Sequence, residues 1–186
     1  MLRIVRKRNL SGRIIGFCLL TMISVDVLAQ SPDNLPLNEH LKPFAPYIGK
    51  TWRGTSTDST NAIHDVSRWE RALNGQAIRI LHSVNEGEYG GETIITWDSE
   101  KESLIFYYFT TAGFYTHGTI TIDGDQFISH EIVTGNQNGI TEVKGIGKIL
   151  PDGRLSSSSQ YFQNGAWVDG HAFIYQEYPD AEVVFQ

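Results

Sequence analysis

Residues 88–118 read EYGGETIITWDSEKESLIFYYFTTAGFYTHG and place six aromatic rings between Phe106 and Tyr115. β-Branched and aromatic residues dominate the stretch, and Gly, Asp and Ser divide it, a pattern typical of strands separated by turns. Residues 103–111 are apolar at both odd and even positions. Because side chains alternate across a strand, this segment needs cover on both of its faces.

The same texture continues from Thr51 toward the end of the chain. Short runs rich in Ile, Val, Thr, Tyr, Phe and Trp alternate with Gly, Asn and Asp, and no internal repeat is visible. The spacing predicts an all-β fold, a single antiparallel up-and-down barrel of about ten strands with a short N-terminal helical turn. The strands are expected near 51–58, 62–73, 76–85, 91–97, 103–111, 114–122, 125–134, 140–150, 154–163 and 166–178.

Three dipeptides indicate the hairpins, because type I′ turns need residues that tolerate positive φ. They are Asn74-Gly75, Asp123-Gly124 and Asn164-Gly165. Two-residue loops at these places predict which residues oppose each other on one face. The predicted pairs are Trp69 with Ile80, Glu70 with Arg79, His117 with His130, Phe162 with Trp167, and Ser158 with His171. Gly145 and Gly147 are expected to mark a bend or bulge.

Residues 1–29 have the features of a secretory signal peptide. Five basic residues lie within 3–13, an apolar run covers 14–25, and Val27-Leu28-Ala29 offers a cleavage site. A membrane anchor is the weaker alternative, since a spanning helix needs about 20 apolar residues. Residues 30–47 contain four prolines and are expected to be a linker with a short helix from Asn38 to Lys42, ended by Pro43. The barrel domain is expected over 48–186.

Removal of the signal peptide changes the net charge, and this charge limits which classes of partner are expected for the mature protein. Losing five basic residues and Asp26 takes the net charge from −6 to −10, which argues against nucleic acid and against membrane association after signal removal. The only cysteine, Cys18, lies in the predicted signal peptide, so no disulfide is expected. The mature part has no Asn-x-Ser/Thr site, which favours a bacterial protein that is periplasmic or secreted.

Two segments carry a family resemblance. Residues 43–54 (PFAPYIGKTWRG) look like the opening of small lipocalin-like barrels, and Tyr89-Gly90-Gly91-Glu92, Trp97-Asp98 and residues 110–114 (TTAGF) resemble the uncharacterised bacterial family called DUF1579. The resemblance covers most of residues 43–175. It implies a calycin-type barrel with an internal cavity and no agreed activity.

Nitrobindin, a haem-binding barrel, is a more distant likeness. The chain departs from its opening motif, since Lys50 and Thr51 separate Gly49 from Trp52 and Thr55-Ser56 replaces the last glycine. Residues 177–186 also contain no histidine. Haem is therefore a minor alternative, and no cofactor and no metal are predicted.

His117 and His130, which are predicted to oppose each other, are the most specific candidate for a functional site in the sequence. If both face inward, two imidazoles about 5 Å apart are able to bind a metal or to titrate together. A metal would need a third ligand, and Glu131 points to the other face. The competing interpretation is a cross-strand pair on a half-exposed face.

Arg71, on the face of Trp69, is the other charged candidate. If buried, its guanidinium needs a carboxylate, either that of Asp65 or that of a ligand. At the rim of the barrel, its stem would lie along the wall and its head in water.

The leading hypothesis is an interior site for a small apolar or amphipathic ligand with a carboxylate or other polar head, rather than a catalytic site. The expected ligand-binding residues are Trp69, Arg71, His82, Tyr108, Tyr115, His117 and His130. Two alternatives stay open: a small enzyme or a haem- or metal-binding barrel that uses the histidine pair, and a structural or interaction module whose aromatic residues are only core. The two apolar faces of 103–111 also predict a homodimer.

Overall fold

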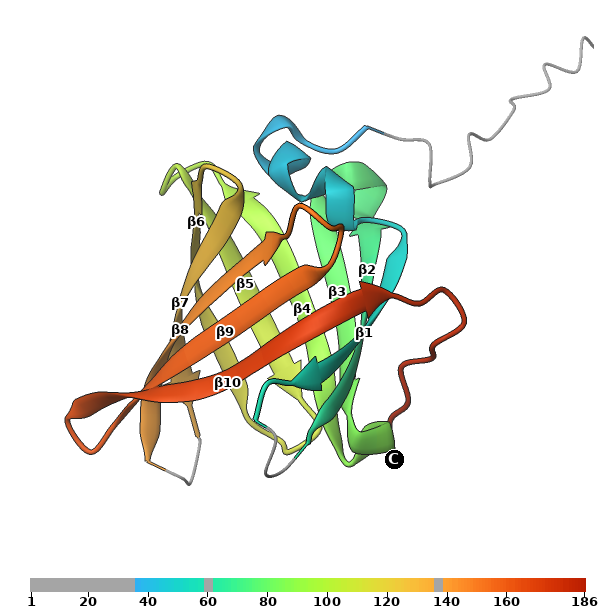
Figure 1. Cartoon of the computed structure of the whole chain (residues 1–186). Helices are drawn as coiled ribbons and strands as arrows, with labels where there is room; N and C mark the ends of the chain where they lie inside the picture. The colour runs from blue at the N-terminus through green and yellow to red at the C-terminus, as the bar shows by residue number, and fades with distance from the viewer. Residues whose placement is uncertain (1–35, 59–61, 136–138) are drawn as a thin grey trace, which may run out of the picture.

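Ten antiparallel strands close into one up-and-down barrel in the part of the chain that the computed structural model describes, residues 36–58, 62–135 and 139–186 (Figure 1). Consecutive strands pair with each other, and β1 pairs with β10 to close the ring. The predicted fold class is therefore confirmed. The strands are β1 (Lys50–Ser56), β2 (His64–Ala72), β3 (Ala77–Val84), β4 (Tyr89–Asp98), β5 (Ser103–Thr110), β6 (Tyr115–Asp123), β7 (Gln126–Thr134), β8 (Ile140–Ile149), β9 (Leu155–Gln163) and β10 (Ala166–Glu177).

A 3₁₀ helix, η2 (Glu39–Tyr47), covers one end of the barrel (Figure 1). Asn38 caps it by accepting a hydrogen bond from the His40 amide, as predicted, but the helix continues through Pro43 and Pro46. Three residues per turn bring positions i, i+3 and i+6 onto one side. Leu41, Phe44 and Tyr47 have this spacing, and all three are buried.

The plugged end is a packed aromatic core. Tyr47 stacks on Trp69 with ring centroids 4.9 Å apart, and Phe44 lies 5.8 Å from Phe127. Trp52 is fully buried beside them. Stacked and tilted aromatic pairs of this kind add to the free energy of burial. The segment expected to be mostly linker therefore completes the core.

Glycines let aromatic rings lie flat against the neighbouring strands. Gly54 on β1 lies under the ring of Tyr175 on β10, and Gly147 on β8 lies under the ring of Phe127 on β7. A Cβ at either glycine would overlap the ring. The expected bend or bulge at Gly145 and Gly147 is wrong, since β8 keeps its register there and the glycine makes room for a side chain.

The first hairpin has the predicted register, and the second does not. Trp69 opposes Ile80, but Asp123 stays paired with Gln126, so the second hairpin turns one residue later than predicted. His117 therefore opposes Ile132, and His130 opposes Thr119. The reason is that only Gly124 in this turn has positive φ, whereas a type I′ turn needs two such residues.

The last hairpin is confirmed near its turn and altered further on. Phe162 opposes Trp167, but a bulge between Asp169 and Ala172 makes Ser158 oppose Ala172 instead of His171. Single-turn helices connect β2 to β3 (η3, Leu73–Gly75) and β3 to β4 (η4, Asn85–Gly87). No helix among the described residues is long and apolar enough to cross a bilayer.

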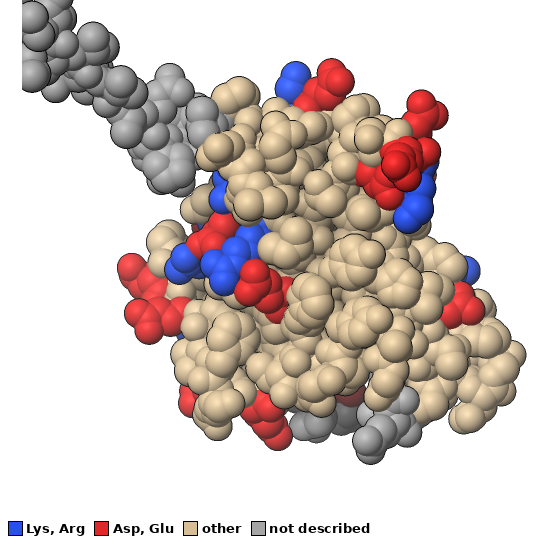
Figure 2. All heavy atoms as spheres, turned by 180° about the vertical axis from the view of Figure 1, so that it is seen from behind, with Lys and Arg blue, Asp and Glu red and all other residues tan. Residues whose placement is uncertain are grey.

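The outer face of the barrel carries two contrasting surfaces. An ion-pair ladder of Arg68, Glu70, Arg79 and Glu92 crosses β2, β3 and β4. Next to it, Figure 2 shows a broad surface without charged residues. Apolar and aromatic side chains of β5, β6 and β7 gather on this side of the wall. We call them the outer aromatic surface: Ile105, Tyr107, Phe109, Tyr115, His117 and Ile132.

Candidate functional site

The barrel interior is hollow at the end opposite η2. A cavity of about 620 Å³ is lined there by strand ends and by the β5–β6 loop, including Val84, Ala112 and Phe114. A second space of about 230 Å³ continues toward Trp69 and Phe127 in the aromatic core. Both spaces are lined by Asp65, His82, Glu131, Ser157 and Tyr175.

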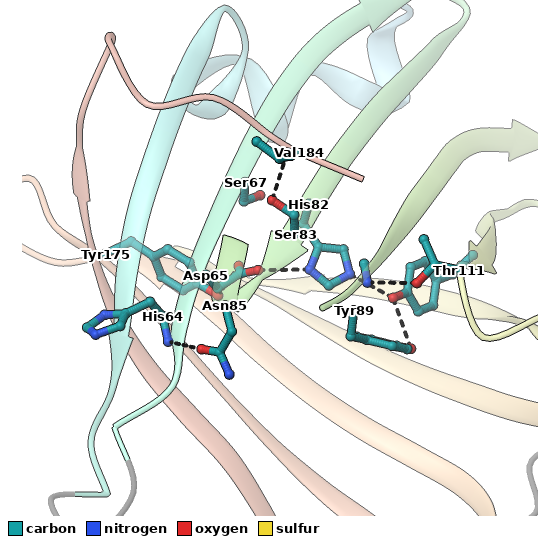
Figure 3. Close-up of polar contacts among 12 residues, drawn as sticks. His64, Asp65, Ser67, His82, Ser83, Asn85, Tyr89, Thr111, Tyr175 and Val184 are labelled. Carbon is teal, nitrogen blue, oxygen red and sulfur yellow. Dashed lines mark hydrogen bonds and ion pairs between the residues drawn. The ribbon is translucent and has the colours of Figure 1, made fainter. Parts of the chain in front are cut away.

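A chain of hydrogen bonds crosses the cavity wall, with His82 at its centre. His82 Nδ1 lies 2.9 Å from Asp65 Oδ1, and His82 Nε2 lies 2.7 Å from the Tyr108 hydroxyl. The Tyr175 hydroxyl donates to Asp65 Oδ2 at 2.9 Å, and the Tyr108 and Tyr89 hydroxyls lie 3.1 Å apart. In Figure 3, Tyr175 approaches Asp65 from the side opposite His82, and Tyr89 lies beyond the far edge of the imidazole.

Strand alternation explains why these groups meet. Asp65 and Ser67 on β2 and His82 on β3 lie on the inner face, and Ser67 directly opposes His82. Asp65 is therefore a diagonal neighbour of the imidazole. Tyr108 reaches His82 from β5 because its ring lies over Gly91 on the intervening strand β4.

The network has two proton arrangements that keep every bond. In one, His82 Nδ1–H donates to Asp65 while Nε2 accepts from Tyr108, which accepts from Tyr89. In the other, both ring nitrogens carry a hydrogen: Nδ1–H still donates to Asp65, and Nε2–H donates to Tyr108, which donates to Tyr89. The imidazole therefore keeps both of its hydrogen bonds in either arrangement.

Burial raises the pKa of the phenols of Tyr89, Tyr108 and Tyr175. These hydroxyls therefore stay protonated near neutral pH and remain hydrogen-bond donors. Tyr175 accordingly holds Asp65 as an acceptor, and Asp65 in turn orients the imidazole of His82. The wall presents fixed polar groups beside the apolar and aromatic side chains of the interior.

Glu131 on β7 is a second inward-facing acid. It lines both spaces and is partly accessible through them, yet protein surrounds most of it, and this burial raises the pKa of its carboxyl group. The buried hydroxyl of Thr116 lies close enough to this carboxyl group to offset part of the rise in its pKa. It makes no hydrogen bond of standard geometry to a described residue. Glu131 takes part in none of the ion pairs of the described chain.

The predicted site residues divide into three groups. Trp69, His82 and Tyr108 line the interior. Arg71 lies at the plugged end in a groove with Ala45 and Ile48. It is six residues from Asp65 along β2, about 20 Å at the rise of a strand, so Asp65 is not its partner.

Tyr115, His117 and His130 lie outside the barrel. The neighbour of Tyr115 and His117 in sequence, Thr116, points inward, so alternation directs both rings outward. His117 stacks near Tyr107, and His130 pairs with Glu142 at 2.6 Å on the exposed surface. The two histidines do not face the lumen, which removes the enzyme hypothesis built on them.

Tyr89, Glu131 and Tyr175 were not among the predicted site residues, and Asp65 was predicted only as a partner of Arg71. For Asp65 a signal was available, since the register of the first hairpin already placed it diagonally to His82. Tyr175 reaches Asp65 only where β1 and β10 close the ring, a contact that hairpin registers do not report. Tyr89 meets Tyr108 on the neighbouring strand β5.

No group of three or more His, Cys, Asp or Glu side chains within the described ranges is arranged to hold a metal ion. The chemistry that the site offers is instead hydrogen bonding and charge inside an aromatic cavity. No family model matches the chain, and no curated protein matches it significantly.

Proposed function

We propose that the barrel binds a small, largely apolar molecule with a polar head in the cavity at its open end. The single observation that carries this proposal is the cavity of about 620 Å³ with the Asp65–His82–Tyr108 network on its wall. Its volume falls in the range of small-molecule pockets, about 300–1,000 Å³, and such pockets combine apolar walls with a few fixed polar groups. Arg71 has no part in this site.

The proposal is tested with N-phenyl-1-naphthylamine, a neutral apolar fluorophore. We expect saturable binding of one molecule per chain with a rise in fluorescence. Filling the cavity with Ser157→Phe should abolish it, since Ser157 lines both spaces. The matched control is Ser158→Phe on the exposed outer face of the same strand, which should bind normally. Equal binding by both variants would refute an interior site.

We further propose that the protein is exported to a bacterial periplasm or medium and is related to the DUF1579-type barrels. The composition of residues 1–29, which lie outside the described residues, supports export. The buried Trp52 and the close contact of Gly54 with Tyr175 support the relationship, since these residues belong to the resembling segment. The mass of the chain purified from envelope fractions should correspond to a start at Gln30.

A homodimer is a second proposal, supported by the outer aromatic surface. Tyr107, Phe109 and Tyr115 are each between 43% and 52% exposed, and a second copy would remove them from water. Sedimentation equilibrium should show a dimer that Phe109→Ser weakens. A strict monomer at high concentration would end this proposal without affecting the interior site.

A further inference from the structure

The charges that line the open-end cavity are unbalanced. Its acids are Asp65 and Glu131, its imidazoles are His82 and His171, and no Lys or Arg is among its described lining residues. Asp65 already faces two partners, His82 and Tyr175. Glu131 is the acid that no cation of the described chain approaches closely enough to pair with.

Glu131 is also close to the tyrosines of the network. The carboxyl group of Glu131 and the rings of Tyr89 and Tyr108 line the same cavity. A buried acid without a partner is costly to ionise, and a ligand cation would supply the missing charge. A ligand carboxylate would instead add a third negative group to the cavity.

Aromatic rings complete this environment. Besides Tyr89 and Tyr108, the cavity is lined by Phe114, Tyr161, Phe173 and Tyr175. The faces of aromatic rings attract ammonium groups, most strongly where water is excluded. Aromatic side chains that line the same space as a carboxylate without a cationic partner form an environment suited to organic ammonium ions.

We propose that the cavity selects an organic cation, an amine or quaternary ammonium with an apolar tail, whose head lies against Glu131 and the tyrosine rings. The tail extends into the smaller space toward Trp69 and Phe127. This inference rests on the proposed binding function and names the ligand class. It replaces the carboxylate head that the sequence suggested, because Arg71, the group expected to receive it, lies at the other end of the barrel.

The test compares decyltrimethylammonium, decanol and decanoate, which share a tail and differ in the head, as competitors of bound N-phenyl-1-naphthylamine at neutral pH. We expect the cation to bind about tenfold more tightly than the alcohol, and the carboxylate to bind most weakly. Equal or tighter binding of decanol or decanoate would overturn the inference and leave the proposed function standing. If none of the three competes while Ser157→Phe still abolishes binding of N-phenyl-1-naphthylamine, the inference fails and the proposed function stands.

A pair of variants locates the head group. Glu131→Gln keeps the shape of the side chain and removes its charge, so the preference for decyltrimethylammonium over decanol should fall to about threefold or less. Glu142→Gln, which changes an acid on the outer surface, should keep the full preference. A preference unchanged in folded Glu131→Gln would contradict the assigned position. If that variant does not fold, the ranking of the three heads on the wild-type protein still decides the ligand class.

Discussion

The two ends of the barrel share one wall and differ in what fills them. At the plugged end, η2 inserts Leu41, Phe44 and Tyr47 among the rings of Trp69 and Phe127. At the open end the same strands enclose a cavity of about 620 Å³ with hydrogen-bonded tyrosines on its wall. An eight-stranded barrel just fills with side chains, and a ring of ten strands encloses more space. The helix η2 fills the extra space at one end, and the cavity at the other end is left for a ligand.

The largest effect is expected at the plug. Phe44→Ala removes a ring that is 1% exposed, and it should lower the free energy of unfolding by about 3–5 kcal/mol in urea denaturation. Leu73→Ala, at a side chain that is 74% exposed, is the control and should change it by less than about 0.5 kcal/mol. A loss below 1 kcal/mol for Phe44→Ala would mean that η2 is only a cover and that the comparison of the two ends is mistaken.

Two glycine substitutions separate stability from binding. A Cβ at Gly91 would overlap the Phe109 carbonyl oxygen and the Tyr108 ring, and a Cβ at Gly147 would overlap the Phe127 ring. Each should cost about 1–3 kcal/mol of unfolding free energy, because both overpack the interior. Gly91→Ala should impair binding of N-phenyl-1-naphthylamine more than Gly147→Ala, since Tyr108 lies on the wall of the open-end cavity and Phe127 borders only the smaller space. Equal binding losses would show that the two ends are coupled rather than independent.

The network itself predicts a smaller effect. Asp65→Asn keeps the volume but presents an amide where two donors, from Tyr175 and His82, now meet a carboxylate. We expect a loss of about 2 kcal/mol in unfolding free energy, the cost of leaving a buried donor unmatched. Asp180→Asn, the same change at an exposed carboxylate, is the control. The absence of any loss from Asp65→Asn would indicate that Asp65 does not hold these donors.

The smallest effect is a change in pH dependence. Because the pKa of folded Glu131 is raised above the unfolded value near 4.5, its contribution to stability is present below that value and is lost as pH rises through the folded pKa. Glu131→Gln should therefore gain stability relative to the wild type as pH increases above about 4.5. Urea denaturation at a series of pH values measures this difference, with Glu142→Gln as the reference. A difference that stays flat or falls with pH would contradict a buried carboxyl.

The sequence predicted the barrel wall better than its contents. Alternation and turn residues located every described strand and placed Trp69 opposite Ile80, because both signals are local. The register predicted from Asp123-Gly124 was wrong because the structure adds one strand pair, Asp123 with Gln126, before the turn. That extra pair moves every other partner in the hairpin by two residues. The length of η2 was underestimated because nothing in the local sequence shows that every third residue of this segment is buried. That burial arises only from packing against the end of the barrel.

The candidate site was partly within reach. His82 and Tyr108 were among the expected ligand-binding residues, and both lie on the cavity wall. Tyr115, His117 and His130 were proposed from composition and an assumed register, and they lie on the outer surface. The contact of Tyr175 with Asp65, 110 residues apart, depends on closure of the ring between β1 and β10, which no local pattern encodes.

The central claim is that the open end, and not the plugged end or the outer surface, takes up a ligand. The most direct measurement is a titration of the isotope-labelled protein with N-phenyl-1-naphthylamine, followed by NMR chemical shifts. The account predicts saturable shifts at His82, Tyr108 and Glu131 with little change at Phe44 and Tyr47. Shifts confined to Tyr107, Phe109 and Tyr115, or no saturable shift inside the barrel, would contradict it.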